Sequence, residues 1–434
     1  MNQSPPEDDR LAGLPPRSRI AELILGSRPH RDTFAGWQHY RARRGQLMPP
    51  AALTLAQWKT TPLPRRSDYD LYRRLTNVNL PLQATPMHDK VTELIQLRLD
   101  GNTMKQDDPT LAGVLVSGWG GYGKTAAVCS SVAAFEDQWR DLHSSLIPGS
   151  IPGTRDVHAP VVYVSTPVTA TPKSLCASIL GFFRAEVRKS ATFPELVRLV
   201  ADSFHDHGVK ALVLDDISRL RMHRADDQDV LDLIRAFMSM DVTVILSGVN
   251  IPGTGLLREA KWDKKTAQWI LPPLEATRIH GREVTQTEHR FELVEIDRFR
   301  YTTPRQIRAF VSHLRGIEAH LRLLNGKPGM LTDGTMPEYL MRRTGGVVGL
   351  LGRLIEDGAQ LAMNTQQETL SETLLDGIVL RRDDPDQPPD EPAIPAEPPA
   401  APQAPATSEK TVPRKRRPRN TVFDDHGPQA EAAG

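Results

Sequence analysis

The chain has 434 residues, 39% of them hydrophobic, which is enough for two or three domains with a substantial core. Its formal net charge of +1 at pH 7 gives no global attraction for a polyanion, so nucleic-acid binding requires local basic patches. The two cysteines, Cys129 and Cys176, are far apart in sequence, so neither a disulfide framework nor a thiolate metal site is expected. Because no apolar run approaches the roughly 18 residues that span a bilayer, we expect a cytoplasmic protein without a membrane segment.

Residues 1–79 are predicted to be an N-terminal extension rich in basic and aromatic side chains. Between Arg28 and Arg74, ten Lys or Arg residues stand against three acids, with Trp and Tyr residues interleaved. Such a segment either contacts phosphates or packs on the rest of the protein through its aromatic side chains while its charges face solvent. The composition leaves both interpretations open.

Residues 80–300 are predicted to form a three-layer α/β domain around a parallel sheet. From about Val91, short runs rich in Val, Leu and Ile alternate with amphipathic helical patterns, which is typical of such domains. Five strands are expected, at residues 113–116, 161–165, 211–214, 243–246 and 291–296.

Residues 301–382 are predicted to be a small all-helical lid that follows the sheet. Apolar residues between Ile307 and Leu324 fall on one helical stripe, and further helices are expected at about 347–363 and 371–380. Residues 383–434 are predicted to be a disordered tail, because nine of the thirty residues from Asp383 to Val412 are proline. The tail carries a basic cluster at residues 414–419.

The segment from Gly118 to Thr125 matches the pattern G-x-x-x-x-G-K-[ST] of a phosphate-binding loop. It follows an apolar strand and opens a helical pattern, which is the context that this pattern requires. Glycines let successive backbone N–H groups point to one centre, while Lys124 reaches the β and γ phosphates and Thr125 ligates Mg²⁺. ATP and Mg²⁺ are therefore the predicted cofactors, since no guanine-reading N-K-x-D pattern occurs. The predicted nucleotide-binding residues of the loop are Gly118, Gly120, Gly121, Tyr122, Gly123, Lys124, Thr125 and Ala126.

Two carboxylates end the strand predicted at 211–214. Asp215 is expected to hold the Mg²⁺ shell, and Asp216 to orient or deprotonate the attacking water. Paired acids at the end of a strand are also common turn formers and helix caps, which is the alternative interpretation. The neighbouring phosphate-binding loop favours the magnesium site.

The turn after the strand at 243–246 supplies a further candidate. Asn250 or Ser247 is expected beside the γ-phosphate, because this strand is predicted to lie between the two strands that carry the motifs. Asn250 is the residue that we assign to nucleotide binding. The alternative is that Asn250 only forms a strand-ending turn.

Six segments, taken in their order along the chain, resemble the TniB/TnsC group of AAA+ transposition ATPases over about residues 80–380. They are the phosphate-binding loop, the strand region 161–167, the carboxylate strand, the turn at 247–248, Arg290 with Phe291, and the segment 343–349. The resemblance implies a P-loop AAA+ fold and an ATP-dependent homo-oligomer that assembles on double-stranded DNA. It further implies recruitment or activation of a DDE transposase, with a TniQ-like protein as a possible second partner.

The resemblance assigns catalytic roles to Lys124, Asp216 and Arg290, and metal binding to Thr125 and Asp215. Arg290 corresponds to the arginine that reaches the nucleotide of the neighbouring subunit, where it stabilises charge on the transferring phosphoryl group. The chain departs from the group at three places. Asp216 stands where Glu is usual, Val249 stands where Thr is common, and no arginine occurs in the turn at 345–349.

Lys173 is the residue that the resemblance favours for DNA contact, mostly through phosphates and with little dependence on base sequence. Two other functions remain open at this stage. One is a P-loop kinase or phosphotransferase, and the other is an ATP-binding adaptor with little hydrolysis, which the shorter acid at Asp216 favours.

Overall fold

The computed structural model describes residues 11, 13–106, 111–147, 157–167, 171–219, 225–251, 261–263, 268–270 and 290–380, with side chains left undescribed at 219, 225–228, 231 and 261–270. These residues lie within one unit, Met1–Ile394. The predicted tail at 383–434 lies outside the described residues. No helix among those described is long and apolar enough to cross a membrane.

Five parallel strands form the central sheet. They are β1 (Gly113–Gly118), β2 (Val161–Ser165), β3 (Ala211–Asp215), β4 (Thr243–Gly248) and β7 (Phe291–Ile296), in the order β2-β3-β4-β1-β7. All five predicted strands are confirmed, and β4 lies between the loop strand β1 and the carboxylate strand β3 as expected. The first four are almost wholly buried, which explains their continuous apolar runs.

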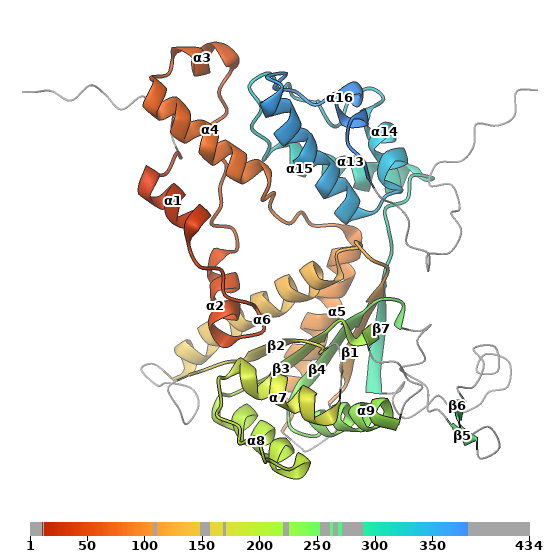
Figure 1. Cartoon of the computed structure of the whole chain (residues 1–434). Helices are drawn as coiled ribbons and strands as arrows, with labels where there is room; N and C mark the ends of the chain where they lie inside the picture. The colour runs from red at the N-terminus through yellow and green to blue at the C-terminus, as the bar shows by residue number, and fades with distance from the viewer. Residues whose placement is uncertain are drawn as a thin grey trace, which may run out of the picture. The chain divides into compact units, whose positions relative to one another are not determined.

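Helices cover both faces of this sheet (Figure 1). α5 (Pro86–Thr103) and α6 (Lys124–Leu146) lie on one face, and α7 (Pro172–Phe182), α8 (Phe193–Asp206) and α9 (Ala225–Phe237) on the other. A 3₁₀ turn, η2 (Ile217–Arg219), follows β3. The short antiparallel pair β5 (Lys261–Asp263) and β6 (Gln268–Ile270) was not predicted. The arrangement is the expected three-layer α/β domain.

The register of the sheet brings the functional segments to one edge. Gly118, at the end of β1, pairs with Ile296 at the end of β7, and Ser165, at the end of β2, pairs with Asp215 at the end of β3. Because all five strands are parallel, their carboxyl ends meet at the same edge. The phosphate-binding loop and both acids therefore follow strands that end side by side.

Among the described residues, four helices follow β7: α13 (Pro304–Glu318), α14 (Met336–Thr344), α15 (Val348–Asn364) and α16 (Glu372–Asp376). Their buried apolar residues form a cluster of their own around Phe310, Leu340 and Leu354. Thr303 starts α13 with a capping box to Gln306. The helix α14 was not predicted from the sequence, because its nine residues are too few to establish a helical period.

The described part of the N-terminal extension is largely helical. It contains α1 (Arg17–Leu25), α2 (Phe34–Arg43), α3 (Leu55–Thr60) and α4 (Leu63–Asn77). Trp37, Tyr69 and Tyr72 are buried, so the extension packs through its aromatic side chains. Several of its basic residues form ion pairs within the protein, among them Arg41 with Glu136 on α6. These contacts agree with the packing interpretation of the segment.

Candidate nucleotide site

The phosphate-binding loop lies between the end of β1 and the first turn of α6. Gly121 and Gly123 have φ values of +75° and +85°, which side chains other than glycine rarely adopt. A Cβ added at Gly123 would lie 3.3 Å from Cγ1 of Val348, at the start of α15. The amide of Gly349 donates to the carbonyl of Gly121 at 2.8 Å. The loop is therefore in contact with the helical segment that follows the sheet.

Lys124 is the first residue of α6 and is 8% exposed. Its ammonium donates to the carbonyl oxygen of Trp119, within the same loop, at 2.7 Å. A buried ammonium needs such an acceptor, and a phosphate oxygen would offer a charged one in the same place. The side chain is thus held at the loop that is predicted to bind phosphate.

Thr125 and Asp215 meet across the site. The Thr125 hydroxyl on α6 donates to Oδ2 of Asp215 at the end of β3, at 2.8 Å. A hydroxyl and a carboxylate are the hard oxygen ligands that Mg²⁺ takes in nucleotide sites, where phosphate and water complete the shell. In the described part of the chain no cluster of three or more His, Cys, Asp or Glu side chains could hold a metal alone. The pair fits a magnesium ion that a nucleotide brings with it.

Asp216 occupies a strained position beside this pair. Its φ is +56°, which is uncommon for residues other than glycine and which Asp tolerates better than most. Its amide donates to Oδ1 of Asp215 at 3.0 Å. The turn that carries Asp216 therefore fixes the second carboxylate oxygen of Asp215. Such outliers gather at functional sites.

Ser247 and Asn250 differ in their surroundings. Ser247 is fully buried, and its hydroxyl has no hydrogen-bond partner among the described residues. Leu246 of β4 pairs with Leu214 of β3, and the next residues on these strands are Ser247 and Asp215. Ser247 and Asp215 therefore take neighbouring positions in the sheet. Asn250 is exposed, with φ of +43°, and this matches the strand-ending turn. The nucleotide-binding role of Asn250 stays a prediction.

Tyr163 on β2 is a site residue that the sequence analysis did not identify. Its hydroxyl donates to Oδ2 of Asp215 at 2.7 Å. Burial, together with the nearby Cys129 and Asp215, raises the pKa of Tyr163, so it remains a hydrogen-bond donor. In the sequence, the one indication of this role is that Tyr163 lies two residues before the end of its strand. That position indicates a contact with Asp215 only when the register of β2 and β3 is known.

Arg290 lies at the opposite edge of the sheet from the loop. It immediately precedes Phe291, which pairs with Gly113 at the start of β1, and it is half-buried. The six residue steps from Arg290 to Ile296 span about 20 Å at the rise of a strand. Arg290 is therefore too far from Gly118, which pairs with Ile296, to serve the site of its own chain. Lys173 is exposed in the first turn of α7.

Residues 112–251 match the sequence model of the AAA domain. No curated protein is similar to this chain in sequence. Similar solved structures include the ORC1 protein of Aeropyrum pernix in complex with DNA, at 14% identity and a TM-score of 0.45, over 69% of this chain and 67% of that one. Drosophila ORC bound to DNA has 12% identity and a TM-score of 0.43, over 70% of this chain and 64% of that one.

The RuvB Holliday junction branch migration motor of Thermotoga maritima has 14% identity and a TM-score of 0.36, over 66% of each chain. This chain thus spans about two thirds of the length of these three structures. Identities this low concern the fold alone, so the assignment rests on the sheet, the phosphate-binding loop and the AAA domain match. Together they define a domain with the P-loop AAA+ fold, and the protein is an ATPase.

Proposed function

We propose that this protein is an ATP-dependent, DNA-binding regulator of transposition that assembles on target DNA and recruits or activates a DDE transposase. The bond between Thr125 and Asp215 carries the nucleotide-dependent part of the proposal, because it joins the loop and the carboxylate strand where Mg²⁺·ATP would bind. The transposition role rests on the resemblance of residues 80–380 to the TniB/TnsC group. A TniQ-like protein and a cytoplasmic location belong to the same proposal.

In the proposed mechanism, the loop amides and Lys124 hold the β and γ phosphates. Thr125 and Asp215 would hold the magnesium ion and its waters, and the ion would neutralise charge on the phosphates. Asp216 orients the attacking water, since it follows Asp215 at the edge of the sheet. Ser247 is a candidate to bond the γ-phosphate or its water, because its buried hydroxyl has no partner in the described part of the chain.

The proposal includes a homo-oligomer in which Arg290 completes the site of a neighbouring subunit. Arg290 is separated from its own loop by the length of β7, which supports action on another subunit. An arginine there would stabilise charge on the transferring phosphoryl group only after assembly. We also propose the division into an extension at 1–79, an ATPase core at 80–300 and a helical lid at 301–382, which the separate apolar clusters support.

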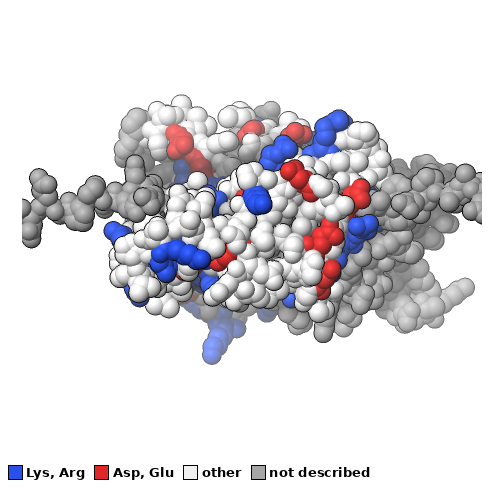
Figure 2. Space-filling view, turned by 90° about the horizontal axis from the view of Figure 1, so that it is seen from above, with Lys and Arg blue, Asp and Glu red and all other residues white. Residues whose placement is uncertain are grey.

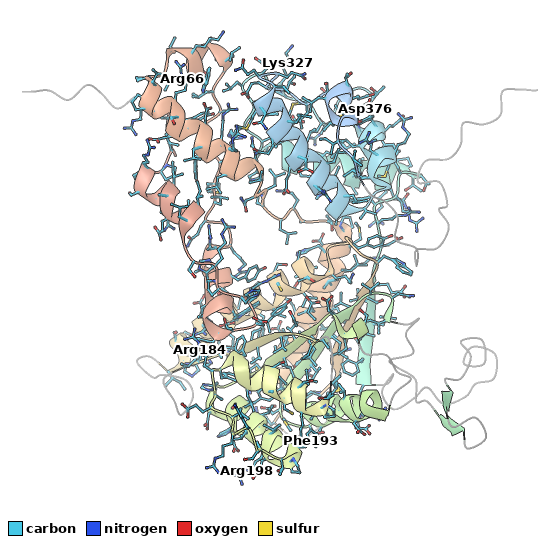
Figure 3. All side chains as sticks on the ribbon, viewed as in Figure 1. Arg66, Arg184, Phe193, Arg198, Lys327 and Asp376 are labelled. Atoms are coloured by element: carbon cyan, nitrogen blue, oxygen red, sulfur yellow. The ribbon has the colours of Figure 1, made fainter. Side chains whose placement is uncertain are left out.

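DNA contact is proposed for the region of α7, with Lys173 as its first candidate. The face shown in Figure 2 mixes basic and acidic side chains, so it offers no uniformly basic surface. Arg184, after α7, is a further exposed basic residue of the sheet domain (Figure 3). Contacts through such side chains would be made to phosphates and would weaken steeply with salt.

An ATP-binding adaptor with little hydrolysis is the second candidate function. Asp216 favours it, since its carboxylate is one methylene shorter than the Glu that is usual in the group, and its backbone is in a left-handed conformation. A water oriented by this side chain would be held differently from one oriented by Glu. Turnover at saturating DNA distinguishes the adaptor from the regulator.

The test is ATP hydrolysis with and without double-stranded DNA. We expect stimulation by DNA in the wild type, and loss of most ATP binding in Lys124→Ala, measured by calorimetry.

Lys173→Ala should weaken DNA binding and reduce its salt dependence. Arg198→Ala is the matched control, because Arg198 pairs with Asp202 on its own helix. Turnover indifferent to DNA would favour the kinase alternative. Binding of ATP without turnover would favour the adaptor.

A further inference from the structure

The N-terminal helix α2 packs on Tyr163, the residue whose hydroxyl bonds the carboxylate proposed to hold magnesium. Trp37 of α2 is fully buried, and its ring stacks on that of Tyr163 with the centroids 5.9 Å apart and an angle of 7° between the planes. The Trp37 indole N–H donates to Oε2 of Glu136 on α6 at 2.6 Å. The indole is thus fixed both by stacking and by a buried hydrogen bond.

Arg31 holds the other side of the same aromatic cluster. Its guanidinium carbon lies 5.4 Å from the ring centroids of both Tyr40 and Tyr163. It also donates to Sγ of Cys129 at 3.4 Å, one turn beyond Thr125 on α6. Cation–π contacts of this kind are stronger where water is excluded. The ring of Tyr163 is therefore held by two residues of the N-terminal extension.

The Tyr163 hydroxyl reaches the proposed magnesium site. It shares Oδ2 of Asp215 with the Thr125 hydroxyl, at 2.7 and 2.8 Å respectively. Tyr163 pairs with Val213, so it lies on the same side of the sheet as Asp215, two residues farther along β3. If the Thr125 hydroxyl were to ligate a metal ion, the hydrogen bond from Tyr163 to Asp215 would remain in place.

We propose that Tyr163 is a positioning residue for Asp215, and that the N-terminal extension holds Tyr163 in place through Trp37 of α2 and through Arg31, which precedes α2. This inference rests on the proposed Mg²⁺·ATP function of the site. Groups that orient a metal ligand commonly change metal affinity 10–100-fold when removed. The extension thereby becomes part of the ATPase site, and a partner that displaces α2 would loosen the magnesium ligand.

The test compares Tyr163→Phe with Tyr40→Phe. Both variants lose one hydroxyl from the same aromatic cluster, but only Tyr163 bonds Asp215. In Tyr163→Phe we expect the Mg²⁺ concentration for half-maximal ATP hydrolysis to rise about tenfold, with ATP binding in EDTA unchanged. Tyr40→Phe should match the wild type. An unchanged Mg²⁺ requirement in Tyr163→Phe, or an equal rise in both variants, would overturn the proposal.

Trp37→Phe tests the part played by α2. It keeps an aromatic ring against Tyr163 and removes the bond to Glu136, so a smaller rise in the Mg²⁺ requirement is expected. A thermal melt of each variant checks that it is folded, and in an Asp215→Asn background Tyr163→Phe should have no further effect. A further effect there would contradict the inference.

If Lys124→Ala still bound ATP tightly, the proposed function itself would fail. If Lys124→Ala were inactive while Tyr163→Phe kept the Mg²⁺ requirement of the wild type, only this inference would be refuted.

Discussion

The guanidinium of Arg73 on α4 and the carboxylate of Glu368 after α15 form a bidentate ion pair, with N–O distances of 2.7 and 2.8 Å. Their side chains are only 4% and 7% exposed. Glu368 also accepts from the amide of Leu324, and Arg73 donates to Asp70. The pair therefore joins the N-terminal extension to the helices that follow the sheet, 295 residues away in sequence.

Glu368→Gln should lower the free energy of unfolding by about 3 kcal/mol, because it leaves a buried guanidinium without its main counter-charge. Denaturant unfolding measures this. The matched control is Asp357→Asn, which breaks an exposed pair with Arg353 on α15 and should cost less than about 0.5 kcal/mol. If the two variants lost similar amounts of unfolding free energy, the buried ion pair would not be what stabilises the packing of α4.

Substitutions of Asp215 and of Asp216 are expected to impair ATP hydrolysis in different ways. Asp216→Asn should preserve ATP binding and stop turnover, because the side chain that orients the water loses its charge. Asp215→Asn should in addition raise the Mg²⁺ concentration that hydrolysis requires, since Oδ2 faces the Thr125 hydroxyl. Calorimetry and a Mg²⁺ titration of the ATPase separate the two effects. Small and equal losses of turnover would count against both roles.

Arg290→Ala should keep ATP binding and lose DNA-stimulated turnover by about 10³-fold, the lower end of the range for such an arginine. Mixing it with Lys124→Ala should restore some activity, since each variant supplies the half of a shared site that the other lacks. Arg305→Ala, in the first turn of α13 and exposed, is the control and should behave as the wild type. If turnover per subunit stayed constant on dilution to monomer, the shared-site mechanism would be contradicted.

His313 on α13 makes the stability depend on pH. It is buried against Phe299, with ring centroids 5.0 Å apart, and burial lowers its pKa to about 4. The unfolded chain takes up the proton from about pH 6.5 downward while the folded chain does not, so stability is lost as pH falls from about 6.5 to 4. The loss amounts to about 3 kcal/mol.

Replacement of His313 by Phe should remove this part of the pH dependence. Thermal melts at pH 7 and pH 5 measure it, and the variant should lose less stability than the wild type between the two. Some dependence should remain, because burial also lowers the pKa of His158 to about 4. An undiminished loss in the variant would show that His313 is not the group responsible.

Deletion of the tail from Asp383 onward should leave ATP binding and thermal stability unchanged, because its proline-rich composition cannot support a core. It should weaken a contact with DNA or with the transposase through loss of the basic cluster at 414–419. Binding assays with each partner measure this. A large drop in melting temperature would instead mean that the segment is needed for folding.

The sequence by itself determined the sheet and the phosphate-binding loop. Each strand is a short buried apolar run, and the loop pattern has a fixed spacing, so both are local properties of the chain. The expected position of β4 between the two motif strands was also correct. Asp215 was placed near the loop for the same reason, since parallel strands end at one edge.

Only the tertiary structure decided what surrounds Asp215. Tyr163 and Trp37 are 126 residues apart in sequence and stack only after α2 packs on the sheet domain. Basic residues of the extension likewise form ion pairs with acids such as Glu136 and Glu368, and the composition alone could not reveal these pairs. Contacts of this kind depend on strand register and on how helices pack, and these are fixed by burial across the whole chain rather than by any local pattern.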